Sequence, residues 1–565
     1  MEVDKDRRRR FEEYRLEEAS EIENTVIDEL VDGVLDRSEF IRRATMFGMS
    51  LSVVGAALEA LGHPGLAFGA PATPVAGGRL KVGIIPPPTT TDPYTYADTG
   101  GLETGSIAGE FLVRATQSLT LLPELALSWK PNGEATVWRY KLRPGVKFHS
   151  GQAFGADDVV ATFDRLVSDP KSAALSAYKG VVSKGGIKKI DNLTVDFHLD
   201  APTAHFPYLT SSTTYQAILL PADYQLGTFV KKAQGTGAYE LVSYNPGVGA
   251  HYNRFPGWWG GHAALDGVDV TYYSDDAATT AALLGKTVNL VGQINFATGR
   301  PLFSNKNVQI FNAHGATHRE VCMRTDLHNP LRDWRVRQAI ALTLDRPAIV
   351  KTLFGKYGGP GNDSPFAPIY PSTNKSVPQR HKDIRKAKQL MAAAGYAHGF
   401  SITLTTEQTG EIPQLAQIIQ RSVRAIGIKM KLNILTEAAY FAGTSTGPPL
   451  GWGTTPWLNT PMNITDWGHR AVPDVYLTGA FKTKGIWNAA HWSNKKFDRA
   501  ATSYVGSVAL KDQQKYAGIM QRILLHDTPV IIPYFYDFLG AGTTSVKGYK
   551  SDAQGSVFLS HTSLA

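Results

Sequence analysis

Three consecutive segments decide the fold class: Thr136-Val-Trp-Arg-Tyr-Lys-Leu142, Arg143-Pro-Gly-Val-Lys-Phe-His-Ser-Gly151 and Ala156-Asp-Asp-Val-Val-Ala-Thr-Phe-Asp-Arg-Leu166. Polar and apolar residues alternate in the first segment, which is typical of a half-buried strand. The second segment contains Pro-Gly and is a turn, and the third is a helix with Asp in its first turn, where a carboxylate is favourable. This order predicts a chain that mixes strands and helices.

The segments on either side continue the mixed pattern. Leu80 to Ile85 is predicted to be the first strand, residues 102–114 to be helical, and Leu193 to Leu199 to be a further strand. A hairpin is predicted over residues 238–253, because Asn245-Pro-Gly247 is a turn sequence.

The length and charge of the chain restrict its class. A chain of 565 residues that is 43% apolar and 10% aromatic is too long for one core and predicts two or three domains. Residues 1–43 hold nine Lys/Arg and fourteen Asp/Glu, so they carry −5 and the remainder carries +13. This bias favours anionic surfaces or solutes. The basic residues are scattered and form no stripe interleaved with aromatic residues, so nucleic acid is not expected as a partner.

Residues 1–43 are predicted to be a charged N-terminal extension with a helical pattern. Its apolar positions are Ile22, Val26, Ile27, Leu30 and Val34.

An export signal is predicted to follow this extension. Arg42-Arg43 directly precedes the weakly hydrophobic run Ala44–Leu58, which is about as long as the apolar region of a secretory signal. The run is shorter than the ~20 apolar residues that a membrane span needs. We therefore predict a twin-arginine signal over residues 44–72, with Ala70-Pro-Ala72 as the cleavage site. The alternative is an ordinary amphipathic N-terminal helix.

Cys322 is the only cysteine of the chain, so no disulfide can form within it and no cysteine near Ala70 can accept a lipid. It lies in a predicted strand and is expected to be a buried apolar group rather than a nucleophile.

The stretch Asn463-Ile-Thr-Asp-Trp-Gly-His-Arg-Ala-Val-Pro-Asp474 is the leading candidate for a binding site. Its Pro473 favours a loop. Trp467 offers a flat apolar face, Arg470 a planar fork of donors for a carboxylate or phosphate, and Asp466 an acceptor for an ammonium. The alternative is that Trp467 covers a core while Arg470 and Asp466 form a surface pair.

Several motifs, in order, resemble the peptide/nickel/opine family of extracytoplasmic solute-binding proteins that serve ABC importers. The resemblance covers residues 80–560, nearly the whole chain after the predicted signal. The motifs are Leu142–Gly151, Phe154–Val159, Gly235–Tyr239, Trp258–Gly261, Trp334–Arg346, Ala387–Tyr396, Asn494–Asp498 and Thr528–Tyr536.

The resemblance implies an α/β, periplasmic-binding-protein-like fold (class II/cluster C), with two lobes, a hinge near residues 311 and 530, and an extra domain. Two such lobes can close on a ligand, which stabilises the closed state by the contacts that it makes only there. The implied parts are lobe I (79–115, 231–311 and 531–565), the additional domain (116–230) and lobe II (312–530).

The resemblance also implies a ligand class. Relatives that hold the ammonium of a peptide commonly carry an acid near the position of Arg470, and the guanidinium inverts the preferred ligand charge. We therefore expect a ligand with a carboxylate or phosphate, such as an opine-like or amino-acid-derived compound. Further ligand-binding candidates, for each of which simple packing is the alternative, are Tyr94, Thr99, Gly101, Glu103, Trp457, Trp487 and Asn488.

Enzymatic alternatives have weaker support. Gly443-Thr-Ser-Thr-Gly447 fits a nucleophile elbow, but Pro448-Pro449 follows where a helix is needed. His314, His318 and Glu320 have a ligand-like spacing in a predicted strand, where alternate side chains point to opposite faces. No phosphate-cradling Gly-rich loop with Lys-Ser/Thr is present, and no cofactor is expected.

The sequence thus predicts an exported, monomeric binding protein that delivers a solute to a permease and its ATPase. An exported hydrolase on a two-domain α/β fold is the alternative, and a role as the partner of a chemosensory receptor stays open.

Overall fold

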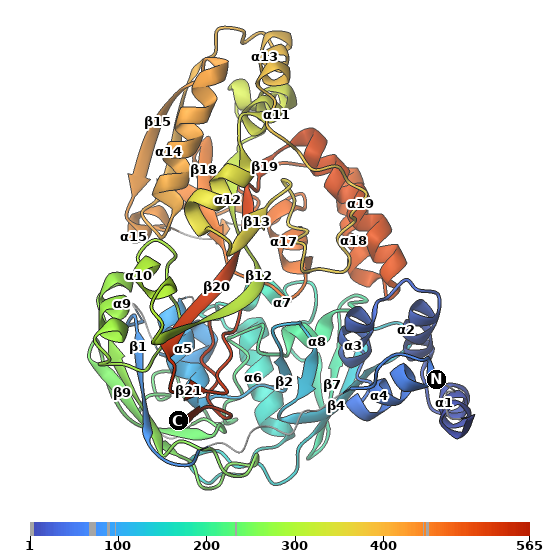
Figure 1. Ribbon diagram of the computed structural model, residues 1–565. Coiled ribbons are helices and arrows are strands. Elements are labelled where there is room, and N and C mark those ends of the chain that lie inside the picture. The colour runs from blue at the N-terminus through green and yellow to red at the C-terminus, as the bar shows by residue number, and fades with distance from the viewer. Residues whose placement is uncertain are drawn as a thin grey trace.

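The computed structural model describes residues 5–66, 75–87, 91–96, 98–231, 234–443, 446–447 and 451–565. Figure 1 shows two bodies joined by two long strands, β12 (Val308–Met323) and β20 (Tyr534–Thr543). The predicted two-lobed α/β fold is confirmed. No helix within these ranges is both long and apolar enough to cross a membrane.

One large sheet passes through both lobes, in the order β15-β14-β18-β12-β20-β11-β1-β10-β9-β8. Lobe I, which is part of the lower body in Figure 1, contributes β1 (Arg79–Ile84), β8 (Tyr239–Asn245), β9 (Gly249–Arg254), β10 (Gly267–Tyr272) and β11 (Leu290–Val291). Lobe II contributes β14 (Ser401–Glu407), β15 (Lys429–Leu435) and β18 (Met462–Trp467), with β13 (Gly358–Pro360) and β19 (Val530–Ile531) beside β20 and β12. The predicted first strand and the predicted hairpin correspond to β1 and to the antiparallel pair β8–β9.

The two lobes are connected through β12 and β20. These strands pair antiparallel from Val308 opposite Thr543 to His318 opposite Phe535, and the register shifts between Ala313 and Thr317. Farther along, β12 pairs with β18 inside lobe II. The ladder is therefore interrupted where the chain passes from one lobe to the other.

The additional domain is built on a four-stranded antiparallel sheet, in the order β4 (Ala126–Pro131), β5 (Val137–Leu142), β7 (Thr194–His198) and β6 (Ile187–Asp191). The predicted strand is β5, in which Trp138, Tyr140 and Leu142 are buried. The predicted helix is α6 (Ala156–Ser168), which contacts β6 and β7 and buries Val159 and Phe163. The strand–turn–helix prediction is confirmed.

The helix predicted over residues 102–114 is only partly present. Helix α5 (Thr99–Ala108) ends before Gly109, and Val113–Ala115 forms strand β2 against β3 (Leu121–Pro123). The helix ends because the backbone of Gly109 is extended, and the position is tightly packed, since a Cβ there would lie 2.6 Å from the side chain of Ile218, which is distant in sequence. Burial on all sides hides this end of the helix from an analysis of apolar periodicity.

Helices cover both faces of the sheet in lobe II (Figure 1). Apolar side chains of α11 (Trp334–Leu342), α12 (Arg346–Phe354), α13 (Ile384–Ala393) and α14 (Ile412–Val423) form one core with β14 and β18. Helices α18 (Lys495–Gly506) and α19 (Leu510–Asp527) belong to the other large core. Cys322 is buried between these layers, as predicted.

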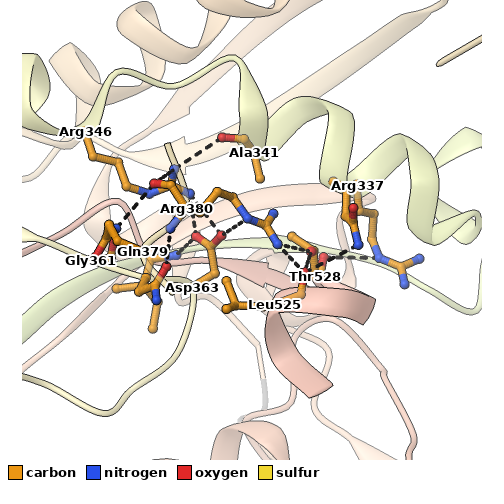
Figure 2. Close-up of polar contacts among 12 residues, drawn as sticks. Arg337, Ala341, Arg346, Gly361, Asp363, Gln379, Arg380, Leu525 and Thr528 are labelled. Carbon is orange, nitrogen blue, oxygen red and sulfur yellow. Dashed lines mark hydrogen bonds and ion pairs between the residues drawn. The ribbon is translucent and has the colours of Figure 1, made fainter. Parts of the chain in front are cut away.

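A buried carboxylate holds the loop after β13 onto lobe II (Figure 2). Asp363 accepts hydrogen bonds from Nη2 of Arg346 at 2.8 and 3.0 Å and from the backbone N–H of Ile532 at 3.2 Å, and Nε of Arg380 lies 3.2 Å away. Arg380 also donates to Thr528 at 3.1 Å. Two buried guanidinium groups thus share one carboxylate, which makes Asp363 indispensable for charge balance.

The N-terminal residues fold as four helices: α1 (Lys5–Glu17), α2 (Glu21–Val31), α3 (Arg37–Met46) and α4 (Leu51–Ala60). Four of the five predicted apolar positions, Ile22, Val26, Ile27 and Leu30, are buried in α2, whereas Val34 lies after the helix and is half-buried. The run Ala44–Leu58 is not one continuous segment, since α3 ends near Gly48, whose φ is +86°, and Ser50 begins α4. The predicted cleavage site at residues 70–72 lies outside the described residues.

Candidate ligand-binding site

The first half of the leading candidate stretch is a strand rather than the predicted loop. Strand β18 places Asp466 opposite Arg319 and Trp467 opposite His318 of β12. The pairing with β12 explains this error, because the partner strand is distant in sequence. The chain leaves the sheet after Trp467, so Gly468 to Pro473 form the connection that was predicted.

Trp467 is part of an aromatic wall at the end of β18. Its ring centroid lies 5.6 Å from that of Tyr476 and 5.6 Å from that of Trp487, both in edge-to-face contact. The Tyr476 hydroxyl donates to the carbonyl of Gly468 at 2.7 Å and so fixes the turn after the strand. The buried indole N–H of Trp467 has no hydrogen-bond partner among the described residues. An unsatisfied buried donor of this kind suits a ligand acceptor.

Arg470 lies beside this wall and is half-buried. Its Nη1 donates to the carbonyl of His469 at 2.8 Å, and within the described part of the chain no carboxylate forms an ion pair with it. Tyr370 donates its hydroxyl to the carbonyl of Arg470 at 2.6 Å and holds the backbone. The guanidinium therefore keeps donors for an external acceptor.

A cavity of about 90 Å³ lies between lobe II and the additional domain at this point. Arg470 and Trp487 line it from lobe II, and hydroxyl and amide side chains line it from the other side. The lining residues of the additional domain that carry these groups are Tyr208, Thr213, Thr214, Tyr215 and Gln216. Small-molecule sites have this mixture of aromatic surface and a few polar groups but usually measure about 300–1,000 Å³, so the cavity is large enough for only part of a ligand.

His469 connects the site to β12. Its Nδ1 accepts a hydrogen bond from the backbone N–H of Ala316 at 2.9 Å. Burial, reinforced by the neighbouring Arg470, lowers the pKa of His469 to about 3. The imidazole is thus neutral at physiological pH and leaves Arg470 as the cation of this group.

Asp466 lies on the opposite face of the strand, where acids predominate. Arg319 pairs with Glu411 at 2.9 Å and lies 4.0 Å from Asp466, whose side chain is 44% exposed. Burial and then Asp466 raise the pKa of Glu407 to about 8, and one of its oxygens has no hydrogen-bond partner among the described residues. This end of the site favours a cationic group.

The candidates from lobe I cluster at the start of α5. Asp98 accepts a hydrogen bond from the N–H of Gly101 at 2.7 Å, and Thr99 begins the helix. Glu103 is buried, and burial followed by the charges of Asp276 and Asp98 raises its pKa well above the usual range. Tyr94 is also buried and contacts Tyr224 in the additional domain.

The two remaining candidates stand apart from this cavity. Trp457 belongs to α16 (Pro456–Asn459) and contacts Phe441 edge to face at 6.2 Å. The amide of Asn488 donates to the carbonyls of Lys482 at 3.1 Å and Trp492 at 2.8 Å. These hydrogen bonds hold the backbone of residues 482–492 in place, so the amide of Asn488 has a structural role.

The structure therefore places Arg470 and Trp487 at one cavity, and Trp467 lies behind Trp487, with 5.6 Å between the two ring centroids. Sequence reasoning missed Thr213 and Gln216, which come from the additional domain and carry no local motif. It also missed the ion pair between Arg319 and Glu411, which joins residues far apart in the chain.

The described residues do not form a catalytic or metal-binding group at either of the two places where the sequence suggested an enzymatic alternative. His314 pairs with Asp537 at 3.0 Å, whereas the buried His318 lies 3.4 Å from Glu320. Within the described ranges, no group of three or more His, Cys, Asp or Glu side chains is arranged to hold a metal ion. Residues 444–445 of the elbow-like sequence lie outside the described residues.

The two-lobed fold, with a cavity between lobe II and the additional domain, is an arrangement suited to ligand binding. The chain belongs to the bacterial extracellular solute-binding proteins, family 5, whose middle region matches residues 120–489. This is a family of binding proteins of ABC importers, as the sequence motifs predicted.

Individual relatives agree with this assignment. The glutathione-binding protein GsiB of Escherichia coli K12 is 26% identical over 475 residues, which cover 82% of this chain and 90% of that protein. The structure of DppA from Helicobacter pylori in complex with the peptide STSA is similar, with a TM-score of 0.72, 22% identity and coverage of 87% of this chain and 98% of that one. AgaA from A. tumefaciens R10 in complex with agropinic acid gives a TM-score of 0.70, 22% identity and coverage of 86% and 99%. The two solved structures support the fold, and these three relatives are binding proteins rather than hydrolases.

Proposed function

We propose that this protein binds a small peptide-like or amino-acid-derived solute that carries a carboxylate, encloses it between its lobes as a monomer, and delivers it to the permease of an ABC importer. The proposal includes the ranges given above for lobe I, the additional domain and lobe II. Closure would bring the two sides of the cavity onto the ligand and stabilise the closed state.

The observation that carries the proposal is the half-buried guanidinium of Arg470. It is oriented by its own backbone, lies beside Trp467 and Trp487, and has no ion-pair partner among the described residues. A guanidinium in such a partly dry setting binds a carboxylate through charge-assisted hydrogen bonds. The indoles supply a flat apolar surface for the remainder of the ligand.

The acids on the other face of β18 suggest how an ammonium would be held. Asp466 is exposed and only partly neutralised by Arg319, which is already paired with Glu411. A ligand that extends past the end of β18 from Arg470 to Asp466 would need an anionic and a cationic end. The names of relatives fit this class, since glutathione and peptides carry both charges.

Binding titrations on the full chain test the ligand class. The probes are glutathione, an unmodified dipeptide and the same dipeptide with an amidated C-terminus. We expect amidation to weaken binding by tenfold or more, because one charged hydrogen bond contributes about 1.5–3 kcal/mol. Arg470→Ala should remove this discrimination, whereas Arg385→Ala, on the exposed face of α13, should retain it. Strong dipeptide binding that survives Arg470→Ala would contradict the proposal.

Export through the twin-arginine route is part of the proposal. The family is extracellular, and Arg42-Arg43 precedes a short, weakly apolar run. Because Arg43 is buried in the folded protein, an export receptor could bind the pair only while the N-terminal helices are undocked. Replacing both arginines by lysine should abolish export, and unchanged export would refute this route.

A further inference from the structure

The N-terminal helices α2–α4 (Glu21–Ala60) contact two parts of the protein at once. Figure 1 shows them between the additional domain and the lower end of α18 and α19 of lobe II. Sequence patterns suggested a removable signal here, whereas the structure places buried side chains of this segment in two interfaces. We call residues 21–60 the N-terminal clasp.

The clasp is attached to the additional domain by close packing. The indole N–H of Trp129 donates to the carbonyl of Met46 at 2.9 Å, and the N–H of Leu121 donates to the Thr45 hydroxyl at 3.2 Å. The ring of Phe47 stacks on Trp138 with 6.3 Å between centroids. These contacts involve the last turn of α3 and Phe47, which directly follows it.

Charged groups attach the clasp to lobe II. Arg43, which is 3% exposed, donates to Oε1 of Gln513 at 3.1 Å and to the carbonyl of Val508. Glu29, which is 8% exposed, lies 3.5 Å from Arg43 and accepts a hydrogen bond from the N–H of Leu510, the first residue of α19, at 2.5 Å. A carboxylate at this end of a helix is favourable.

A third contact brings the N-terminal clasp, the additional domain and lobe II together around Gln513. The side-chain amide nitrogen of Gln513 lies 3.0 Å from Nε2 of His205 in the additional domain, and Nδ1 of His205 lies 3.0 Å from a carboxylate oxygen of Asp474 in lobe II. Gln513 therefore links the clasp, the additional domain and lobe II.

The junction adjoins the candidate ligand site. Arg42, Arg43 and Met46 line a cavity of about 30 Å³ together with Ala471 and Val472, which directly follow Arg470. Arg42 also donates to the carbonyl of Ile369 at 3.0 Å, next to the Tyr370 that holds the backbone of Arg470. The clasp thus supports the outer side of the predicted binding segment.

We propose that the clasp is retained in the working protein and holds lobe II against the additional domain, so that it favours the closed arrangement and slows ligand release. The statement on ligand release rests on the proposed function, whereas the effect on the lobes does not. If lobe II moved away, Arg43 and Glu29 would lose partners while remaining largely buried, which is unfavourable. Arg43 and Glu29 are positioning residues in this scheme, because they act on the ligand only through the lobes.

The distance between the lobes in the ligand-free full chain tests the proposal. Spin labels at Val248→Cys, in the exposed turn between β8 and β9, and Lys388→Cys, on α13, report this distance, and the buried Cys322 does not react in the folded protein. In the double variant Arg43→Met/Glu29→Gln we expect the population at longer distances to rise by about tenfold, the change that the loss of one charged hydrogen bond gives.

Lys130→Ala is the matched control. It removes a 3.6 Å contact with Glu23 that joins the clasp to the additional domain but not to lobe II. We expect an unchanged distance distribution for this variant. An unchanged distribution in a folded Arg43→Met/Glu29→Gln protein, with folding verified by its melting temperature, would overturn the proposal. The single variant Glu29→Gln, which keeps the shape of the side chain, covers the case in which the double variant does not fold.

Retention has its own test. The intact mass of the exported protein should include residues 21–60, and a mature protein that begins near Thr73 would overturn the proposal while leaving the ligand-binding function intact.

Discussion

Replacing Asp363 by Asn should destabilise lobe II by about 3–5 kcal/mol, the usual result of removing one partner from a buried ion pair. Asn keeps the size of the side chain and tolerates the left-handed backbone at this position, where φ is +54°. The change therefore removes the charge with little added strain. The carboxylate is fully buried and lies between Arg346 and Arg380, so both guanidinium groups would remain in the interior without a counter-charge.

Urea unfolding followed by circular dichroism measures this loss, with the midpoint of the transition and its slope compared between the wild type and the variant. Asp157→Asn serves as the matched control, because Asp157 pairs with Lys189 at 2.7 Å on the surface with 70% of its side chain exposed. Exposed pairs of this kind contribute about 0–1 kcal/mol. A loss below about 1 kcal/mol in Asp363→Asn, comparable to the control, would refute the idea that this carboxylate balances the charge of lobe II.

Three further changes give separate expectations. Burial lowers the pKa of His149 to about 4, so between about pH 6.5 and pH 4 the unfolded chain binds a proton at this residue that the folded protein does not. Up to about 3 kcal/mol of stability should therefore be lost as the pH falls over this range. His149→Gln should flatten the pH dependence of the melting temperature. Gly48→Ala should expose the clasp to trypsin, because a Cβ there would lie 1.7 Å from the carbonyl oxygen of Trp129, whereas Gly62→Ala has a similar positive φ with open space around it and should not. Trp467→Phe should weaken ligand binding in a titration, because it removes an indole N–H that has no partner among the described residues and is free to donate to a ligand.

The sequence predicts elements well where the signal is local. The alternation in Val137–Leu142 and the Asp residues at the start of Ala156–Ser168 define β5 and α6 without knowledge of the fold. The family and its two lobes follow from motifs spread along the chain. Arg470 and Trp467 could be identified as candidates because a guanidinium, an indole and the carboxylate of Asp466 lie within five positions of the sequence.

Features that depend on distant partners could not be predicted in this way. Asp466 and Trp467 lie in a strand because β12, more than 140 residues earlier, pairs with them. Thr213 and Gln216 reach the cavity from a different domain and carry no signature. The run Ala44–Leu58 is short and weakly apolar, which suits both an export signal and a docked pair of helices. The contacts of this segment with Trp129, Trp138 and Gln513 join it to distant residues and carry no local signal.

The irregular pairing in β12 has a mechanical consequence. At Ala316 the backbone N–H is used by the imidazole of His469 instead of by the neighbouring strand β20. A twist of the two crossing strands must therefore either stretch this bond or move the turn that presents Arg470. The bending of β12 and β20 and the orientation of the Arg470 guanidinium are then coupled. A substitution at His469 should therefore change the rotation of the two lobes, although His469 does not itself contact the ligand.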